Sequence, residues 1–318
     1  MRKWCIPAAL LVILAAMLLY MQALVGHQSL QKEAERWQGE STTPFRQIAA
    51  FLPNASTAEG AADTSRRLQA ELEDDILCAY GSWEDSEASF AKRRTQVEVY
   101  RVSSDFFRLH SFDAANGAAA SFQSEDDVAI LNEEAAWQLF GSNQCIGEYI
   151  TVGEEISRVL AVIAEPQGSV NARAFGGTAR IYTKITAVQP VTFYELILPE
   201  YYTGFAEQTV QAALGTAVIT DCTDRFRIAA LWTAAVSFFF GLQQEAVNTP
   251  PWEFSAQQTQ RQLCLLAVLC IVIGVSLLCL LIRFVLREIR KMRNRKQSGQ
   301  AGDTPCEQAD AVLSETLL

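Results

Sequence analysis

Histidine is scarce in this chain, with only His27 and His110 among 318 residues. Neither belongs to an HExxH motif, and no GxSxG motif or GxxxxGK[ST] phosphate loop occurs. These motifs mark zinc proteases, α/β-type serine hydrolases and P-loop nucleotidases, because each places a metal ligand, a nucleophile or a phosphate cradle at a fixed position. Their absence argues against all three enzyme classes.

Cysteine is present eight times, but no pair has the CxxC or CxxH spacing of a structural zinc site. Five cysteines lie in the apolar end segments or the C-terminal tail: Cys5, Cys264, Cys270, Cys279 and Cys306. The other three are Cys78, Cys145 and Cys222. The sequence is compatible with one disulfide and a leftover thiol, or with three free thiols.

Other catalytic patterns are incomplete. Ser89 to Lys92 forms an SxxK match, but no SDN or KTG triplet accompanies it. The adjacent acidic pairs are poor candidates for a catalytic dyad, because neighbouring side chains on a strand point to opposite faces; these pairs are Asp126-Asp127, Glu133-Glu134 and Glu154-Glu155. We therefore predict a protein that is not an enzyme, with no catalytic residue, no cofactor site and no metal site.

Charge is missing from two long segments. Residues 4–26 and 263–282 contain no charged residue, and a bilayer-spanning helix needs about 20 such residues. We predict transmembrane helices at both. The first segment could instead be a cleaved signal peptide, although its apolar run is longer than the usual one and "YMQALVG" is a poor cleavage site.

Basic residues flank both predicted spans. Arg2 and Lys3 precede the first span, and seven basic residues follow the second: Arg283, Arg287, Arg290, Lys291, Arg293, Arg295 and Lys296. The positive-inside rule then places both termini in the cytoplasm. The segment between the spans, 27–262, has 17 basic and 31 acidic residues. Such an acidic surface repels nucleic acid.

The central segment mixes helix and strand signals irregularly, which predicts an α+β fold. We expect a helical stalk at 28–40, an apolar element ended by Pro53-Asn54, and a helix capped by Ser56. Gly153-Glu154 marks a hairpin turn. Further strands are expected at 76–80, 95–102, 180–185 and 192–200, with a loop after the first of these, and a helix is expected at 204–214.

The apolar segment 226–242 contains Arg227. Were it a third span, the basic run after Ile282 would lie outside, against the charge rule. We interpret it as an interfacial or partner-packing helix.

The stretch "VAILNEEAAWQLFGS", Val128 to Ser142, reads as a buried strand followed by a short helix. Asn132 is the expected helix cap, and Gly141 supplies the turn out of the helix. Glu133 and Glu134 fall in the first turn, where negative charge complements the helix dipole.

An ordered series of such pieces resembles the MacB-like periplasmic core domain, the ectodomain of ABC-transporter permeases of the MacB/FtsX group. The matching positions are Phe106-Phe107, Val128 to Asn132, Ala135-Ala136, Leu139 to Gly141, Ile146-Gly147 and Val159 to Ile163. The resemblance implies a membrane-proximal lobe, built from about 27–100 and 186–225, that carries an inserted lobe. Members usually have four spans, whereas this chain shows one clear span after its ectodomain, as in a truncated two-span variant.

The expected architecture is an α+β extracytoplasmic domain of two lobes, held between two transmembrane helices. Its parts are a cytoplasmic N-terminus (1–3), the first span (4–26), the extracytoplasmic domain (27–225, inserted lobe about 101–185), the interfacial helix with a linker (226–262), the second span (263–282) and a cytoplasmic tail (283–318).

The resemblance implies a subunit of an ABC transporter-like assembly in the bacterial cell membrane. Its ectodomain would bind a partner or exported substrate and relay motion across the membrane. Expected partners are the lipid bilayer, a separate ATPase or four-span permease, and a second copy in a homodimer, but no nucleic acid. The basic stretch Arg287 to Lys296 is either an ATPase contact or a simple flank of the span. An alternative function is a membrane-anchored receptor or adhesion module.

Overall fold

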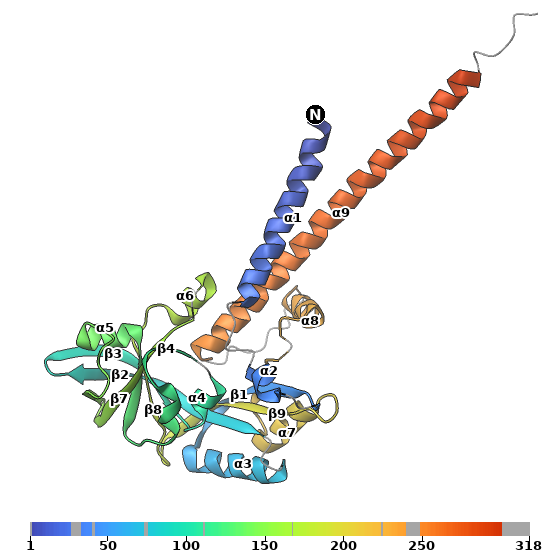
Figure 1. Cartoon of the computed structure of the whole chain (residues 1–318). Coiled ribbons are helices and arrows are strands. Elements are labelled where there is room, and N and C mark those ends of the chain that lie inside the picture. Colours follow the sequence, from blue (N-terminus) through green and yellow to red (C-terminus); the bar gives the residue numbers. More distant parts are fainter. Residues whose placement is uncertain are drawn as a thin grey trace, which may run out of the picture. The chain divides into compact units, whose positions relative to one another are not determined.

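The computed structural model describes residues 2–26, 33–39, 42–72, 76–110, 112–166, 168–223, 225–239 and 249–300. The chain forms two compact units, one of Met1–Tyr20 with Leu266–Leu318 and one of Met21–Leu265. Figure 1 shows the helices and strands of both units. His27, Cys306 and the C-terminal tail from residue 301 lie outside the described residues.

Two long apolar helices provide the first unit. Helix α1 covers Arg2–Gly26 and helix α9 covers Pro251–Gln300. The parts long and apolar enough to cross a bilayer are Pro7–Gly26 and Pro251–Arg293. Side chains such as Leu19 and Leu281 are exposed rather than covered by protein, as expected for helices solvated by lipid. The prediction of an apolar helix on each side of the central domain is confirmed.

The second unit is built on one ten-stranded sheet. Its strands follow the order β10-β1-β9-β2-β3-β8-β5-β7-β4, while β6 pairs with β2 and β7. Their bounds are β1 Phe45–Thr57, β2 Leu77–Phe90, β3 Arg93–Val102, β4 Asp113–Gly117, β5 Val128–Asn132, β6 Tyr149–Val152, β7 Glu155–Ala164, β8 Arg180–Lys184, β9 Pro190–Pro199 and β10 Val218–Asp221.

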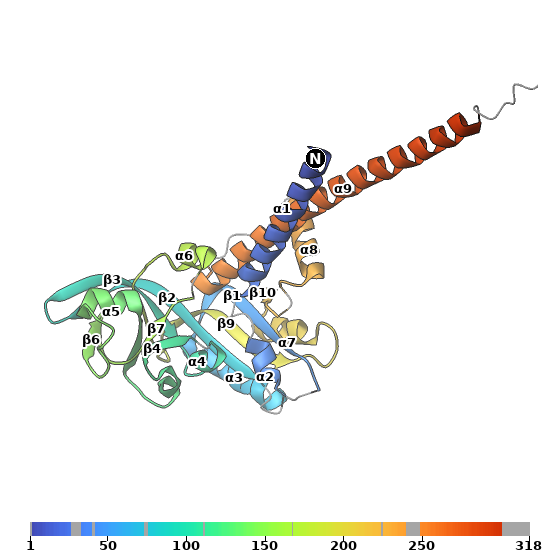
Figure 2. The same cartoon turned by 45° about the horizontal axis from the view of Figure 1, so that its top comes forward.

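The long hairpin of β2 and β3 runs through the middle of the sheet (Figure 2). On one side, β2 pairs antiparallel with β9. On the other side, β3 pairs parallel with β8, which leads to β5, β7 and β4. The strands between residues 113 and 184 therefore occupy one end of the sheet, and β10, β1 and β9 occupy the other.

Both edges of the sheet are short strands. The edge strand β4 has five residues, and its pairing with β7 is interrupted by a register shift between Ala114 and Asn116. The other edge strand, β10, has four residues and ends at Asp221, which pairs with Arg46 at 3.4 Å.

Helices cover both faces of the sheet, and three buried apolar clusters result. Helices α3 and α7 pack on one face of β1 and β9, while α2, α4 and the first turns of α9 pack on the other (Figure 1). Helix α5 packs against β3, β5 and β7. The bounds are α2 Glu33–Gln38, α3 Ala58–Glu71, α4 Phe106–Leu109, the 3₁₀ helix η2 Ala119–Gln123, α5 Glu133–Phe140, α6 Ser169–Phe175, α7 Phe205–Leu214 and α8 Ile228–Phe239.

The strand–helix unit at 128–142 agrees with its prediction. Strand β5 is buried along its whole length, and the Asn132 side chain accepts a hydrogen bond from the Ala135 amide at 2.9 Å. Helix α5 ends at Gly141, which has a φ of 75°. A side chain there would be strained and would meet the guanidinium of Arg93.

Several local predictions are also confirmed. The hairpin with Gly153-Glu154 at its turn joins β6 to β7, with Val152 opposite Glu155. Strands β3, β8 and β9 and helix α7 lie at the predicted segments. The mixed α/β architecture follows the prediction as a whole.

Other local predictions were wrong. The cap of α3 is Thr57 rather than Ser56, and β1 continues past Pro53 to Thr57 through a register shift between Phe51 and Ser56. Strand β2 runs on to Phe90 instead of ending in a loop, because β3 pairs with it over ten residues. In the expected stalk, α2 packs against the sheet, with Ala34 buried.

The region before the second span also differs from its prediction. Helix α8 covers Ile228–Phe239, while residues 240–248 lie outside the described part. Helix α9 begins at Pro251, twelve residues before the expected span, so residues 251–262 are helix rather than linker. The reason is packing, because Trp252, Ala256 and Thr259 of this extension are buried.

Candidate functional site

The residues weighed as catalytic candidates are dispersed in the structure. Ser89 lies near the end of β2 and Lys92 lies in the exposed turn before β3. Within the described residues, no group of three or more His, Cys, Asp or Glu side chains could hold a metal ion.

Members of the three acidic pairs form separate local contacts. Glu133 accepts from the Asn143 amide at 3.0 Å, whereas Glu134 accepts from Gln138 at 2.7 Å. Asp126 pairs with Lys184 at 3.0 Å, and Glu155 pairs with Arg101 at 2.8 Å. These carboxylates serve as local structural contacts.

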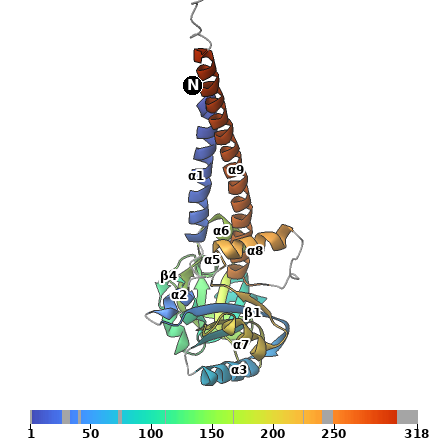
Figure 3. The ribbon, with the colours of Figure 1, turned by 90° about the vertical axis from the view of Figure 1, so that its right-hand side faces the viewer.

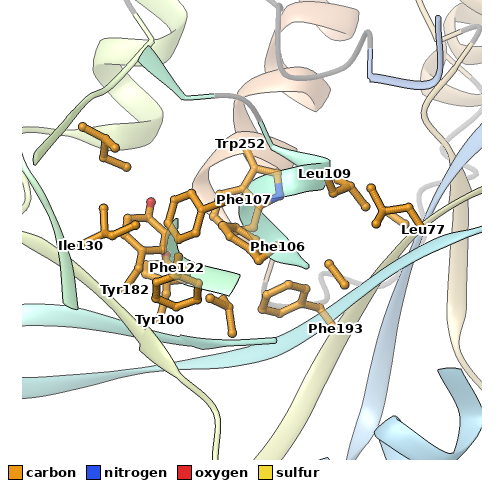
Figure 4. Close-up of a cluster of buried hydrophobic side chains, with 14 of the residues drawn as sticks. Leu77, Tyr100, Phe106, Phe107, Leu109, Phe122, Ile130, Tyr182, Phe193 and Trp252 are labelled. Carbon is orange, nitrogen blue, oxygen red and sulfur yellow. The ribbon is translucent and has the colours of Figure 1, made fainter. Parts of the chain in front are cut away.

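The most concentrated buried chemistry surrounds the start of α9. Pro251 occupies the first helical position, where its missing N–H costs nothing. Trp252 is buried among aromatic rings, with centroid distances of 5.5 Å to Tyr100, 5.5 Å to Phe106 and 5.9 Å to Phe193 (Figure 4). A single aromatic cluster thus joins α9 to strands β3 and β9 and helix α4.

A buried carboxylate lies beneath that cluster. Trp252 Nε1 donates a hydrogen bond to Glu195 Oε1 in β9, and His110 Nε2 lies 2.8 Å from Glu195 Oε2. All three side chains are buried. A carboxylate removed from water requires such partners, since an unpaired buried charge is very costly. The single histidine of the described domain therefore packs against Glu195 and Trp252.

A second buried contact follows at the next residue of α9. Arg225 donates to Glu253 through two nitrogens, at 3.0 Å from Nη1 to Oε2 and 2.8 Å from Nη2 to Oε1. Burial alone would lower the pKa of Arg225, but the Glu253 carboxylate outweighs it and raises that pKa. This planar two-point pairing fixes geometry as well as charge.

Cys222 lies beside the same pair. Its sulfur is 3.4 Å from Arg225 Nη2, and burial raises the pKa of the thiol well above its usual value. Cys78, Cys145 and Cys222 are all buried free thiols. The free-thiol alternative for these three residues is thus the one that the structure shows.

A third contact reaches helix α6, where Ser255 Oγ forms a hydrogen bond with Asn171 Oδ1. We use the term helix joint for the six residues in these contacts: Trp252, Glu253 and Ser255 of α9 with Glu195, Arg225 and Asn171. Sequence reasoning missed it, because the bonded partners are separated by 28 to 84 positions in the sequence. The signal available was the "PWE" start of a helix, with Pro at its first position and acid in its first turn.

A second polar cluster ties strands together at the other end of the sheet. Arg180 in β8 contacts Glu98 at 2.7 Å and Glu165 at 2.7 Å. Asn132 donates to Glu165 and to the Thr178 carbonyl, both at 2.8 Å. We call Arg180, Glu98, Glu165 and Asn132 the Arg180 cluster. Burial raises the pKa of Glu165, although Arg180 and Asn132 oppose that rise.

A surface groove lies between α3 and α7. Its free volume is about 830 Å³, and its lining includes Leu52, Tyr194 and Leu214 as well as Arg66 and Arg67. Arg66 pairs with Asp63, and Arg67 donates to Thr64 at 3.2 Å. We call this the α3–α7 groove. Its lining combines apolar side chains with the charged residues Asp63, Arg66 and Arg67.

Comparison with known proteins identifies the domain type. The family model described as MacB-like periplasmic core domain matches residues 9–218. Similar solved structures include the periplasmic region of MacB from Actinobacillus actinomycetemcomitans, with a TM-score of 0.44 and 11% identity over 67% of this chain and 99% of that chain. Another is the extracellular domain of the noncanonic ABC-type transporter YknZ from Gram-positive bacteria, with a TM-score of 0.39 and 14% identity over 53% and 90%. No curated protein matches the chain.

Proposed function

Because the chain belongs to the family of MacB-like periplasmic core domains, we propose that it is a non-enzymatic membrane subunit of an ABC transporter-like assembly. Its domain binds a partner or exported substrate outside the cytoplasm, and the helix joint passes motion between that domain and α9. Both termini lie in the cytoplasm of a bacterial cell. The supporting observation is the continuity of α9, which runs unbroken from the buried Trp252 to Gln300.

The helix joint suits transmission because it resists separation. Glu253 and Arg225 are both almost completely buried, and breaking such a pair costs about 3–5 kcal/mol. Three polar contacts at the start of α9 reach three separate partners, Glu195 in β9, Arg225 after β10 and Asn171 in α6, and so oppose rotation of the helix. A displacement of α9 is therefore carried to β9 through Glu195 and to α6 through Asn171.

The cytoplasmic partner is an ATPase held by the basic end of α9. Arg283, Arg287 and Arg290 lie on this helix and are exposed. Basic side chains at this level would meet an acidic surface on the ATPase. A deletion of 287–296 should abolish co-purification of the ATPase. Unchanged co-purification would leave the basic stretch as a simple flank of the membrane span.

The α3–α7 groove is the proposed binding surface for the exported substrate or partner. The central segment between the spans is strongly acidic, whereas this groove is lined by two arginines, Arg66 and Arg67, and one acid, Asp63, beside apolar side chains. An amphipathic anion or an acidic peptide is the ligand chemistry that fits. The variant Arg67→Glu should weaken capture of such a ligand, and Arg94→Glu, on an exposed strand pair elsewhere, should leave it unchanged.

The decisive experiment separates attachment from transmission. The full chain is affinity-purified from membranes, the co-purifying chains are identified, and the Arg225→Met variant is compared with wild type and with Arg94→Met. We expect an ATPase or a four-span permease to co-purify with all three proteins. Transport should be lost only in the Arg225→Met variant. Absence of any transporter component from the wild-type sample would favour the receptor or adhesion function instead.

A further inference from the structure

Helix α8 carries an exposed apolar stripe. Ile228, Trp232 and Val236 are 87%, 62% and 38% exposed, and they recur every four residues. Side chains at that spacing lie along one side of a helix. No charged residue occurs between 228 and 239. A soluble domain rarely leaves a stripe of this kind in water.

A neighbouring side of α8 is packed against α9. Leu231 and Ala235 are buried, and the Leu231 carbonyl accepts a hydrogen bond from the Cys264 thiol at 3.2 Å. Leu263 of α9 is buried as well. Figure 3 shows α8 running across the first section of α9. The two sides of α8 therefore face different surroundings.

The contact with Cys264 places α8 beside the first residues of the predicted second span. Leu263 and Cys264 are the first two residues of the charge-free run 263–282. A run of 20 residues is only just long enough to cross the hydrocarbon layer. Its first residues therefore lie at the boundary between hydrocarbon and headgroups, and so does the helix beside them.

Helix α8 is too short to cross the bilayer itself. Its twelve residues extend roughly 18 Å, against a hydrocarbon core of about 30 Å. We propose that α8 lies in the plane of the membrane–water interface, on the extracytoplasmic side of the cell membrane. There it inserts Ile228, Trp232 and Val236 into the lipid. Tryptophan favours this boundary because its ring is apolar and its N–H is polar. The helix thereby braces the point where α9 enters the membrane.

Fluorescence quenching by brominated lipid tests this placement. The full chain is placed in nanodiscs whose phosphatidylcholine carries bromine near the headgroup end or near the methyl end of the acyl chain. The difference between wild type and Trp232→Phe isolates the emission of Trp232. The difference between wild type and Trp137→Phe isolates a control, since Trp137 is exposed on α5. Neither substitution alters a buried side chain.

We expect Trp232 to be quenched more by the bromine near the headgroup than by the deeper one, and to be protected from aqueous acrylamide. Trp137 should show the reverse, with acrylamide quenching and no effect of bromolipid. Ile228→Asn, which leaves the Leu231 side intact, should reduce the bromolipid quenching of Trp232. The proposal is overturned by acrylamide quenching of Trp232 equal to that of Trp137, or by stronger quenching from the deeper bromine. Protection that depends on a second copy or another protein, without bromolipid quenching, would also overturn it.

Discussion

The helix joint and the Arg180 cluster are both networks of buried polar side chains, but they connect different elements of the domain. The Arg180 cluster joins β3, β8, the end of β7 and the cap of α5, all within one end of the sheet. The helix joint instead holds α9, an element that continues beyond the domain. Glu98 and Glu165 are 27% and 17% exposed, whereas Glu253 is 1% exposed. The attached helix is thus held by the more completely buried pair.

The largest effect is expected from Arg225→Ala. It leaves the Glu253 carboxylate buried without its partner, which should lower the free energy of unfolding by about 3–5 kcal/mol. Urea unfolding of the full chain in detergent measures the loss. Hydrogen exchange should accelerate at 252–259 of α9 but not in β8.

A matched double variant checks the cause. Arg225→Met with Glu253→Leu removes both charges and keeps similar volume, so most of the stability should return. If Arg225→Ala lowers the free energy of unfolding by less than about 1 kcal/mol, the Glu253 carboxylate is hydrated in the variant. The helix joint would then not be more costly to break than the Arg180 cluster.

A smaller effect is expected from Arg180→Ala. The carboxylates that remain are partly exposed and can recover some hydration, so the loss should be about 2–3 kcal/mol. Exchange should accelerate in β8 and at the start of α5, and the first turns of α9 should keep their protection. Equal acceleration in both places would mean that the two ends of the sheet unfold as one cooperative unit.

Asn132→Ala should cost about 2 kcal/mol. About half of that is the lost helix cap, and the rest comes from the Glu165 and Thr178 oxygens that lose a donor. Thr57→Ala is the matched control, because Thr57 caps α3 with a single exposed contact at 3.2 Å. Its cost should stay at or below about 1 kcal/mol. Equal losses of stability in Asn132→Ala and Thr57→Ala would show that Asn132 stabilises the domain only as a helix cap.

The smallest effect concerns a buried group that has no counter-charge. Burial raises the pKa of the Cys78 thiol from 9.0 to about 12. Between these values the unfolded chain ionises and the folded chain does not, so stability should fall as pH rises, by about 1 kcal/mol at pH 10. Cys78→Ala should flatten that part of the pH profile in urea titrations. If stability still falls with pH to the same extent in Cys78→Ala, the pH dependence belongs to other titrating groups.

The sequence predicted those elements whose determinants are local. Asn132, Glu133 and Gly141 lie within ten residues, and each specifies its own backbone conformation, so β5 and α5 were located correctly. The Gly153-Glu154 turn was recognised for the same reason. Thr57 and Ser56 are adjacent cap residues, and only the pairing of β1 with β9 decides between them.

The helix joint was not predictable in this way. Trp252 and Glu195 are separated by 57 positions, and no periodic pattern marks a pair that meets only after the sheet has formed. Residues 251–262 were predicted as linker because their buried partners, Glu195 and Arg225, belong to other elements. The same holds for the Arg180 cluster, where Arg180 and Glu98 meet across a parallel strand pair.

The short edge strands have a consequence for assembly. An exposed strand edge is a template on which another copy can add a strand, and long flat edges promote aggregation. Here β4 offers five residues with a register shift and carries Asp113, and β10 offers four residues that end in the Asp221–Arg46 pair. Copies of this domain crowded on a membrane should therefore resist joining sheet to sheet, and remain soluble at high local concentration.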